Sequence, residues 1–123
     1  MGHLCLPSYW VRGSKLWDGV PYEIGMRYHE KPMKPERLSN SHKHDFDQIL
    51  GFLGSNPDDM AEFDAELHIY LGEEREKYII TSPCAILVPA GLYHCPLEFV
   101  KVNKPFFFYE VNMTASYKRE DKD

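Results

Sequence analysis

The 123-residue chain has few cysteines and lacks the sequence signatures of several common classes of protein. Its three cysteines are an odd number without C-x2-C spacing, which argues against a disulfide framework and favours a reducing compartment. No apolar stretch reaches the length of a membrane span, and the N-terminus lacks the basic start and sustained apolar core of a secretory signal. We therefore expect a cytoplasmic protein.

Positive charge is also scarce, because Asp and Glu outnumber Lys and Arg by 19 to 14 and leave a net charge of -5. Without a basic stripe, neither nucleic acid nor an anionic membrane is an expected partner. The sequence contains no nucleophile elbow, phosphate-binding loop or dinucleotide fingerprint. It also shows no internal repeat, so we expect residues 1–123 to form a single domain of sufficient size for one core.

Short segments with alternating side-chain character dominate the chain. They are rich in aromatic and branched residues and are bounded by Gly, Pro, Asn or Asp, as strands are. Turn signals such as Gly72-Glu-Glu74 and Pro89-Ala-Gly91 recur between them at hairpin-like spacings. The predicted strands cover residues 21–28, 42–53, 65–71, 77–81, 84–88 and 105–111. This pattern predicts an all-β fold, an antiparallel sandwich or barrel of the jelly-roll type.

The two ends of the chain are expected to differ from the rest. Residues 1–20 are interpreted as an N-terminal extension or an edge strand, in which Trp10 and Trp17 could cover a sheet edge of a partner subunit or of the protein itself. Residues 118–123 are all charged and are interpreted as a disordered tail.

Three histidines are candidate metal ligands. His42 and His44 are two positions apart, so on a strand both imidazoles would point to the same face. Gln48 has the same parity if no bulge intervenes. His94 follows the turn at residues 89–91, which would return the chain toward the strand ends. Because an exposed pair of histidines is common on ordinary surfaces, it is the third histidine that favours a metal site.

These residues resemble the two sequence motifs of the cupin superfamily. The first motif reads G-x5-H-x-H, then three or four residues, E, six residues and G. Here Glu36 stands at the leading Gly, Gln48 replaces the usual Glu, and Gly54 comes one residue early. The second motif reads G-x5-P-x-G-x2-H-x3-N, and its centre is intact at Pro89, Gly91 and His94. The order of the motifs and their setting among strand-like segments make the likeness more specific than a lone H-x-H pair.

The resemblance implies a cupin-type antiparallel β-barrel, also called a double-stranded β-helix, formed by a single cupin domain. It implies a divalent transition metal ion, Fe, Mn, Ni, Cu or Zn, held by His42, His44, Gln48 and His94. Cupins often pair through outer strands, so a homodimer is expected. An open position on the ion suits a metal-dependent enzyme of the dioxygenase or isomerase type acting on a small molecule. The alternative is a non-catalytic module that binds or senses a small molecule.

The source of a negatively charged ligand is left open by the sequence. On the segment 65–71, Glu66 shares one face with His68, and Leu67 and Ile69 share the other. If the apolar face points inward, Glu66 is solvated or lies at an interface. If Glu66 points inward, it supplies the carboxylate that Gln48 lacks.

Other residues near the histidines are interpreted as structural. Cys95 should point away from the side of His94 on a regular strand, which favours a buried, inert thiol. The aromatic residues with suitable parity, among them Phe106 and Phe108, are interpreted chiefly as core. No residue is identified as a general acid or base.

Overall fold

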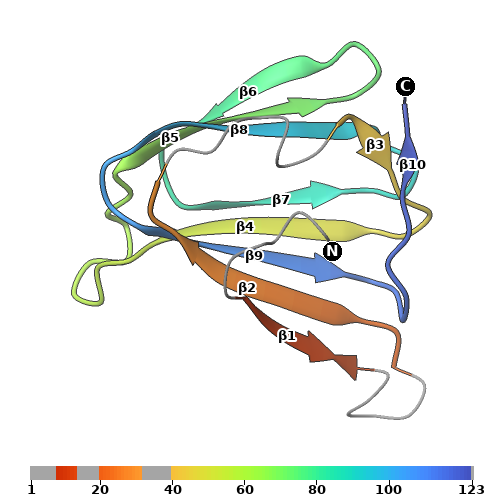
Figure 1. The fold of residues 1–123 in the computed structure, drawn as a ribbon, viewed down its shortest axis with the longest axis horizontal. Helices are drawn as coiled ribbons and strands as arrows, with labels where there is room; N and C mark the ends of the chain where they lie inside the picture. The colour runs from red at the N-terminus through yellow and green to blue at the C-terminus, as the bar shows by residue number, and fades with distance from the viewer. Residues whose placement is uncertain (1–7, 14–19, 32–39, 123) are drawn as a thin grey trace.

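The computed structural model describes residues 8–13, 20–31 and 40–122, which form ten β-strands in two antiparallel sheets. The strands of the first sheet are Tyr9–Arg12 (β1), Glu23–His29 (β2), Phe106–Asn112 (β9), Gln48–Gly54 (β4) and Cys84–Val88 (β7), in the order β1-β2-β9-β4-β7. Those of the second are Glu120–Asp121 (β10), His42–Lys43 (β3), His94–Val102 (β8), Ala65–Leu71 (β5) and Glu76–Ile80 (β6), in the order β10-β3-β8-β5-β6. The prediction of an all-β fold is confirmed (Figure 1).

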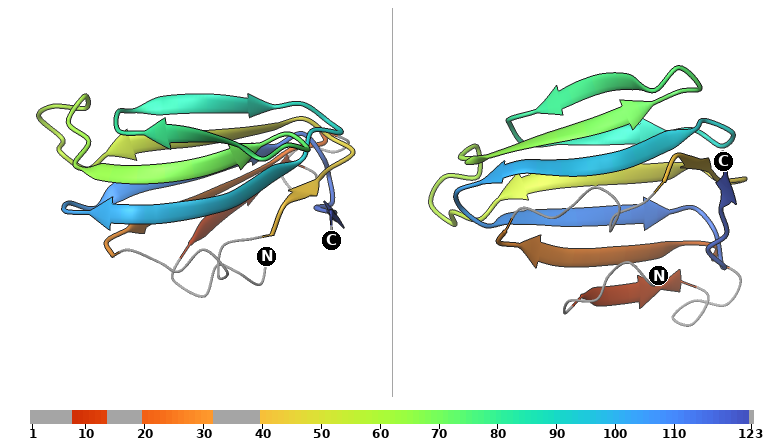
Figure 2. Two further views of the ribbon diagram at one scale, coloured as in Figure 1. Left: turned by 90° about the horizontal axis from the view of Figure 1, so that it is seen from above. Right: turned by 45° about the horizontal axis from the view of Figure 1, so that its top comes forward.

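The two sheets form the layers of a sandwich (Figure 2). Apolar side chains fill the space between them. On β5, Leu67 and Ile69 are fully buried, whereas their neighbours on the strand are half-buried. On β9, Phe106 and Phe108 face the same interior as Phe52 of β4. This alternation explains why these segments form strands, since each strand buries one face against the other sheet.

The predicted and observed strands agree closely in the middle of the chain. Segments 65–71 and 84–88 coincide with β5 and β7, and segments 21–28, 77–81 and 105–111 overlap β2, β6 and β9. The single strand predicted over 42–53 is wrong, because β3 pairs within the second sheet and β4 within the first. Strand β8 was not among the predicted strands, although it forms the centre of the second sheet.

The ends of the chain contribute to both sheets. Strand β1 pairs along β2 as an edge strand, and the Trp10 ring lies against Gly25, where a Cβ atom would approach it to 2.4 Å. The expectation of a disordered tail does not hold for Glu120 and Asp121, which pair with β3 as β10. Residues 1–7, 14–19, 32–39 and 123 lie outside the described residues, so the expectations for Trp17 and Glu36 do too.

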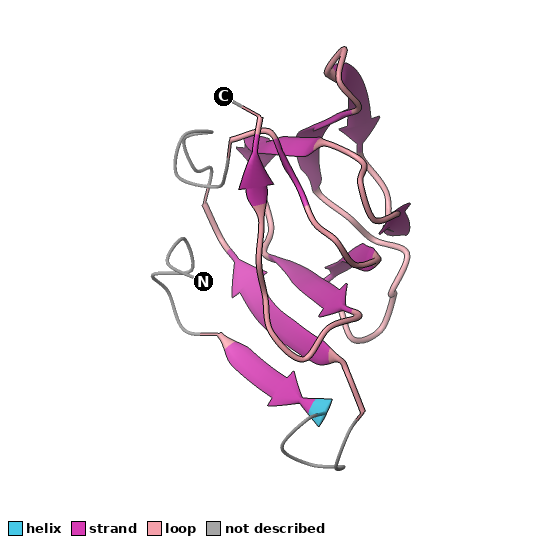
Figure 3. Ribbon diagram, turned by 90° about the vertical axis from the view of Figure 1, so that its right-hand side faces the viewer, coloured by secondary structure: helices cyan, strands magenta, loops and turns pink. Residues whose placement is uncertain are grey.

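The two ends of the sandwich differ in the segments that form them. The short strands β3 and β10 lie together at one end, which faces the viewer in Figure 3, and the connection between β4 and β5 lies at the other (Figures 1 and 3). The described part of the chain contains no helix with the length and apolarity needed to cross a membrane.

Candidate metal centre

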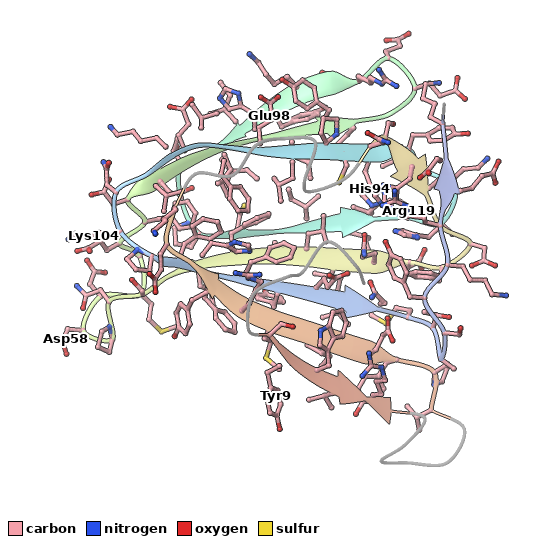
Figure 4. All side chains as sticks on the ribbon, in the orientation of Figure 1. Tyr9, Asp58, His94, Glu98, Lys104 and Arg119 are labelled. Atoms are coloured by element: carbon pink, nitrogen blue, oxygen red, sulfur yellow. The ribbon has the colours of Figure 1, made fainter. Side chains whose placement is uncertain are left out.

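The three predicted histidines lie together at the end of the sandwich that contains β3 and β10. Their ring centroids are 4.9 Å apart for His42 and His44, 4.3 Å for His42 and His94, and 5.0 Å for His44 and His94. All three side chains are buried, with exposures of 3, 5 and 2%. The structure therefore brings together residues that are up to 52 positions apart in the chain, and Figure 4 shows His94 at this end.

Strand pairing and a turn hold the histidines in place. His42 is the register partner of His94 across β3 and β8. The turn before His94 is tied to the segment after β3, because the Gly91 amide donates to the His44 carbonyl oxygen at 2.8 Å and the Ala90 amide donates to Asp47 Oδ1 at 2.9 Å. Gly91 has a φ of 86°, which glycine adopts without steric cost.

Main-chain carbonyl groups fix the orientation of all three rings. His42 Nδ1 lies 2.7 Å from the Asn40 oxygen, His44 Nδ1 lies 2.5 Å from the Lys118 oxygen, and His94 Nδ1 lies 3.3 Å from the Leu92 oxygen. Because a carbonyl oxygen only accepts, each of these hydrogen bonds places the proton on Nδ1. The lone pair is then on Nε2, as in histidines that bind a metal through Nε2.

Burial keeps the imidazoles neutral. It lowers the pKa of His42 to about 4 and that of His94 to about 3, and it also lowers the pKa of His44. The positive charge of Arg119 acts in the same direction on all three rings. Neutral imidazole is the form that binds metal ions, so near neutral pH no proton has to be removed from these rings first.

Two buried polar atoms at the candidate residues have no hydrogen-bond partner among the described residues: His44 Nε2 and Gln48 Oε1. The Gln48 amide nitrogen donates to Asn112 Oδ1 at 2.7 Å and to Glu110 Oε2 at 3.1 Å. Because both partners are acceptors, they fix which end of the carboxamide is nitrogen and which is oxygen. Buried polar atoms without partners are costly. Imidazole nitrogen and amide oxygen are both metal ligands, so the donor set fits a divalent transition metal.

A buried polar network behind Gln48 was missed by the sequence analysis. Glu110 is 4% exposed, and burial raises its pKa to about 7. Asn112 donates to Glu110 Oε2 at 3.3 Å and to Glu23 Oε1 at 2.9 Å, and Arg12 pairs with Glu23 at 3.6 Å. On β9, every second residue from Phe106 points inward. Continuing this alternation beyond Phe108 predicts that Glu110 and Asn112 also point inward.

Tyr117 is a second residue that the sequence did not identify. Its ring centroid is 5.0 Å from that of His44 and 6.1 Å from that of Phe46. Burial raises the pKa of Tyr117, and the charges of Glu110 and Cys95 act in the same direction. Tyr117 therefore lies beside His44 and near enough to Glu110 to be affected by its charge.

Glu66 does not belong to this group of residues. Its carboxylate contacts His68 Nε2 at 2.7 Å on the outer face of β5, and its side chain is 38% exposed. The inward face of β5 is formed by the fully buried Leu67 and Ile69. The alternative in which Glu66 points into the barrel is therefore wrong, and the prediction that the apolar face points inward is confirmed.

Cys95 is buried, but it does not point away from the histidines as predicted. One ligand atom from each of His42, His94 and Cys95 lies within 4.8 Å of the others. The physical reason is a bulge: Ile69 pairs with Leu97 and Leu71 with His94, so β8 uses three steps where β5 uses two. Cys95 adopts a φ of 77° in this bulge, and such bulges redirect side chains.

A surface hollow of about 490 Å³ lies beside His44. Its basic side chains are Lys43, Lys118 and Arg119, and its acidic side chains are Asp45 and Glu120. Figure 4 shows Arg119 close to His94 at the same end of the sandwich. The hollow therefore has a rim of mixed charge and reaches one of the three histidines, His44.

Solved structures of similar fold cover almost the whole chain. A variant of oxalate decarboxylase OxdC from Bacillus subtilis is 11% identical, with a TM-score of 0.59 over 94% of this chain and 27% of its own. The formate complex of Lactobacillus farciminis oxalate decarboxylase is 9% identical, with a TM-score of 0.59 over 94 and 30%. The DMSP lyase DddQ from Ruegeria pomeroyi DSS-3 is 11% identical, with a TM-score of 0.53 over 85 and 44%.

The similarity to these proteins lies in the fold. The chain spans 27 to 44% of the length of these three proteins, so it corresponds to a part of each. No protein-family model and no curated protein sequence matches the chain.

Proposed function

Because the chain has the cupin fold, as oxalate decarboxylase and DddQ do, we propose that it is a metal-dependent cupin enzyme that acts on a small molecule. The observation that carries this proposal is the meeting of three buried imidazoles, each held through Nδ1 by a main-chain carbonyl. The proposed ligands are His42, His44, Gln48 and His94.

The donor set suits a catalytic ion better than a structural one. Three imidazoles and one carboxamide leave a position open on a five- or six-coordinate ion. When bound, a divalent ion supplies Lewis acidity toward a substrate oxygen, or a place for an oxidisable substrate beside O2, which correspond to isomerase and dioxygenase chemistry. The chain's own residues keep the imidazoles neutral, fix their orientation and exclude bulk water by burial.

The substrate that we propose is a small organic anion. Arg119 acts electrostatically on all three histidines, so its positive charge also reaches an anion bound between them. Lys43 and Lys118 add positive charge to the rim of the hollow. The name of oxalate decarboxylase indicates an anionic substrate for that protein, and this supports the same class here.

Metal analysis of the purified chain tests the proposed centre. After dialysis with Fe, Mn, Ni, Cu or Zn, elemental analysis is expected to show a stoichiometric divalent ion. His94→Ala should weaken binding by more than about 100-fold, because loss even of a residue that supports a ligand costs roughly 10- to 100-fold. The matched control is His68→Ala on the outer face of β5, which should bind metal as the wild type does. A chain that binds none of these ions would contradict the metal centre.

Activity of the metal-loaded chain tests the enzymatic part of the proposal. A panel of small carboxylates is followed by oxygen consumption and by NMR of the products. Oxygen uptake that depends on metal and substrate would support a dioxygenase, and formation of an isomer without oxygen uptake would support an isomerase. A chain that holds metal and binds a carboxylate without turnover would contradict the enzyme and favour a binding module.

A further inference from the structure

We propose that Cys95 is an anionic ligand of the same metal ion, so that the centre combines imidazole nitrogen with a thiolate sulfur. This inference rests on the proposed function, because it concerns the composition of the same site. A Cys95 thiolate would also be the negatively charged ligand that the sequence analysis did not identify.

The geometry of the buried cluster supports a shared ion. The ligand atoms of His42, His94 and Cys95 all lie within 4.8 Å of one another, and all three residues are buried. On a tetrahedral ion, bonds of about 2.0–2.1 Å to nitrogen and about 2.3 Å to sulfur place ligand atoms about 3.3–3.6 Å apart, so each of the three atoms would have to move by about 1 Å or less. Small side-chain movements therefore suffice to bring the three atoms onto one ion.

The backbone turns this cysteine inward. On a regular strand Cys95 would lie on the opposite face from His94, yet the extra residue of β8 places both side chains in the interior. The positive φ of Cys95 is uncommon for a residue with a side chain. Such a conformation is typical of sites where the surrounding structure fixes a side chain for a purpose.

Charge gives a second, independent argument. The other proposed ligands, His42, His44, Gln48 and His94, are all neutral, and a divalent ion in a buried site is stabilised by a nearby negative charge. Glu66 faces outward, and Glu110 is hydrogen-bonded to Gln48 and Asn112. When the ion binds, the sulfur–hydrogen bond of Cys95 is broken, its proton passes to solvent, and a metal–sulfur bond forms.

A thiolate changes which ions the site selects. Sulfur ligands favour softer ions, such as Zn²⁺ and copper, whereas oxygen ligands suit Mn²⁺. We therefore expect Cys95→Ser to weaken Zn²⁺ binding by more than about 10-fold while it changes Mn²⁺ binding much less. The matched control is Cys84→Ser on the exposed surface of β7, which should change neither affinity.

X-ray absorption of the Zn²⁺-loaded protein tests the bond directly. The double variant Cys5→Ser, Cys84→Ser keeps Cys95 as its single cysteine and is expected to show a sulfur neighbour at about 2.3 Å beside nitrogens at about 2.0–2.1 Å. Cys95→Ser should lose the sulfur contribution. The double variant leaves the cluster intact, so the test does not depend on how Cys95→Ser folds.

The outcomes separate this inference from the proposed function. Zn²⁺ bound by the double variant through nitrogen and oxygen alone would overturn the role of Cys95 and leave the metal centre standing. A wild-type chain that binds no Zn²⁺ or other divalent ion would overturn both.

Discussion

Among single residues, His29 shows how burial controls a titratable side chain away from the candidate metal centre. Its ring stacks on Phe106 with centroids 5.3 Å apart and meets the edge of Phe99 at 4.6 Å. Burial in this aromatic cluster, together with the nearby charge of Arg27, lowers the pKa of His29 to about 3. The folded protein therefore accommodates this residue in its neutral form.

The fold is expected to lose stability in acid because of His29. His29 takes up a proton near pH 6.5 in the unfolded chain and only near pH 3 in the folded chain. The stabilising contribution of the neutral, buried ring is therefore complete above about pH 6.5 and is lost as the pH falls from about 6.5 to about 3. Between about pH 6.5 and about pH 4 the loss is on the order of 3 kcal/mol. Urea unfolding of metal-free protein at several pH values measures it. His29→Leu should reduce the pH dependence by this amount, and an unchanged slope would contradict the prediction.

The sequence identified some residues of the site and not others, for physical reasons. His42, His44 and His94 could be predicted because an H-x-H pair on a strand and a Pro-x-Gly turn have local geometric consequences. The position of Cys95 depends on a bulge, which inserts a residue and which alternation alone does not reveal. Glu110 could have been found, since it continues the inward parity of Phe106 and Phe108.

Among the elements, β3 and β4 show that side-chain alternation does not reveal where the chain passes from one sheet to the other. Burial alternates without interruption from His42 to Leu50, although the chain leaves one sheet and enters the other between β3 and β4. Both sheets face the same interior, so inward residues keep their parity across the change. Side-chain pattern therefore predicts which residues point inward, but it does not show where a strand changes its partners.

The segment that ends in β10 is expected to contribute to metal binding. The Lys118 carbonyl oxygen accepts from His44 Nδ1, and β10 pairs with β3 beside His42. Deletion of residues 118–123 should weaken metal binding by roughly 10- to 100-fold, the usual effect of removing a group that orients a ligand. Isothermal titration with Zn²⁺ measures the change.

The matched control for this deletion is Lys118→Ala, which removes the side chain and retains the carbonyl group. It should bind Zn²⁺ as the wild type does. Equal affinity of the shortened chain and the wild type would show that the hydrogen bond to His44 is not needed.

For the whole molecule, stability depends on the core that the two sheets share. Phe52 is fully buried, and its ring centroid lies 5.3 Å from that of Phe108 and 6.4 Å from that of Phe106. Phe52→Ala should lower the free energy of unfolding by about 3–5 kcal/mol, because the cavity is enclosed by both sheets. Leu87→Ala on β7, 62% exposed in the wild type, should change it by less than about 0.5 kcal/mol. Chemical denaturation of both variants measures the difference, and similar values for the two would contradict this account of the core.

The architecture as a whole followed from the motifs and the strand pattern together. The cupin-type fold predicted from His42, His44 and the turn before His94 is confirmed by the arrangement of the sheets and by the similar solved structures. The homodimer and the cytoplasmic location stay predictions, because outer-strand pairing and compartment depend on molecules other than this chain.

The carbonyl groups that orient the three imidazoles belong to the main chain at residues 40, 92 and 118, and every amino acid carries such a group. Exchange of the side chains at these positions leaves the acceptors in place. The centre should thus tolerate extensive mutation of its surroundings, provided that the backbone path persists. A site built in this way can be retained while the side chains around it diverge.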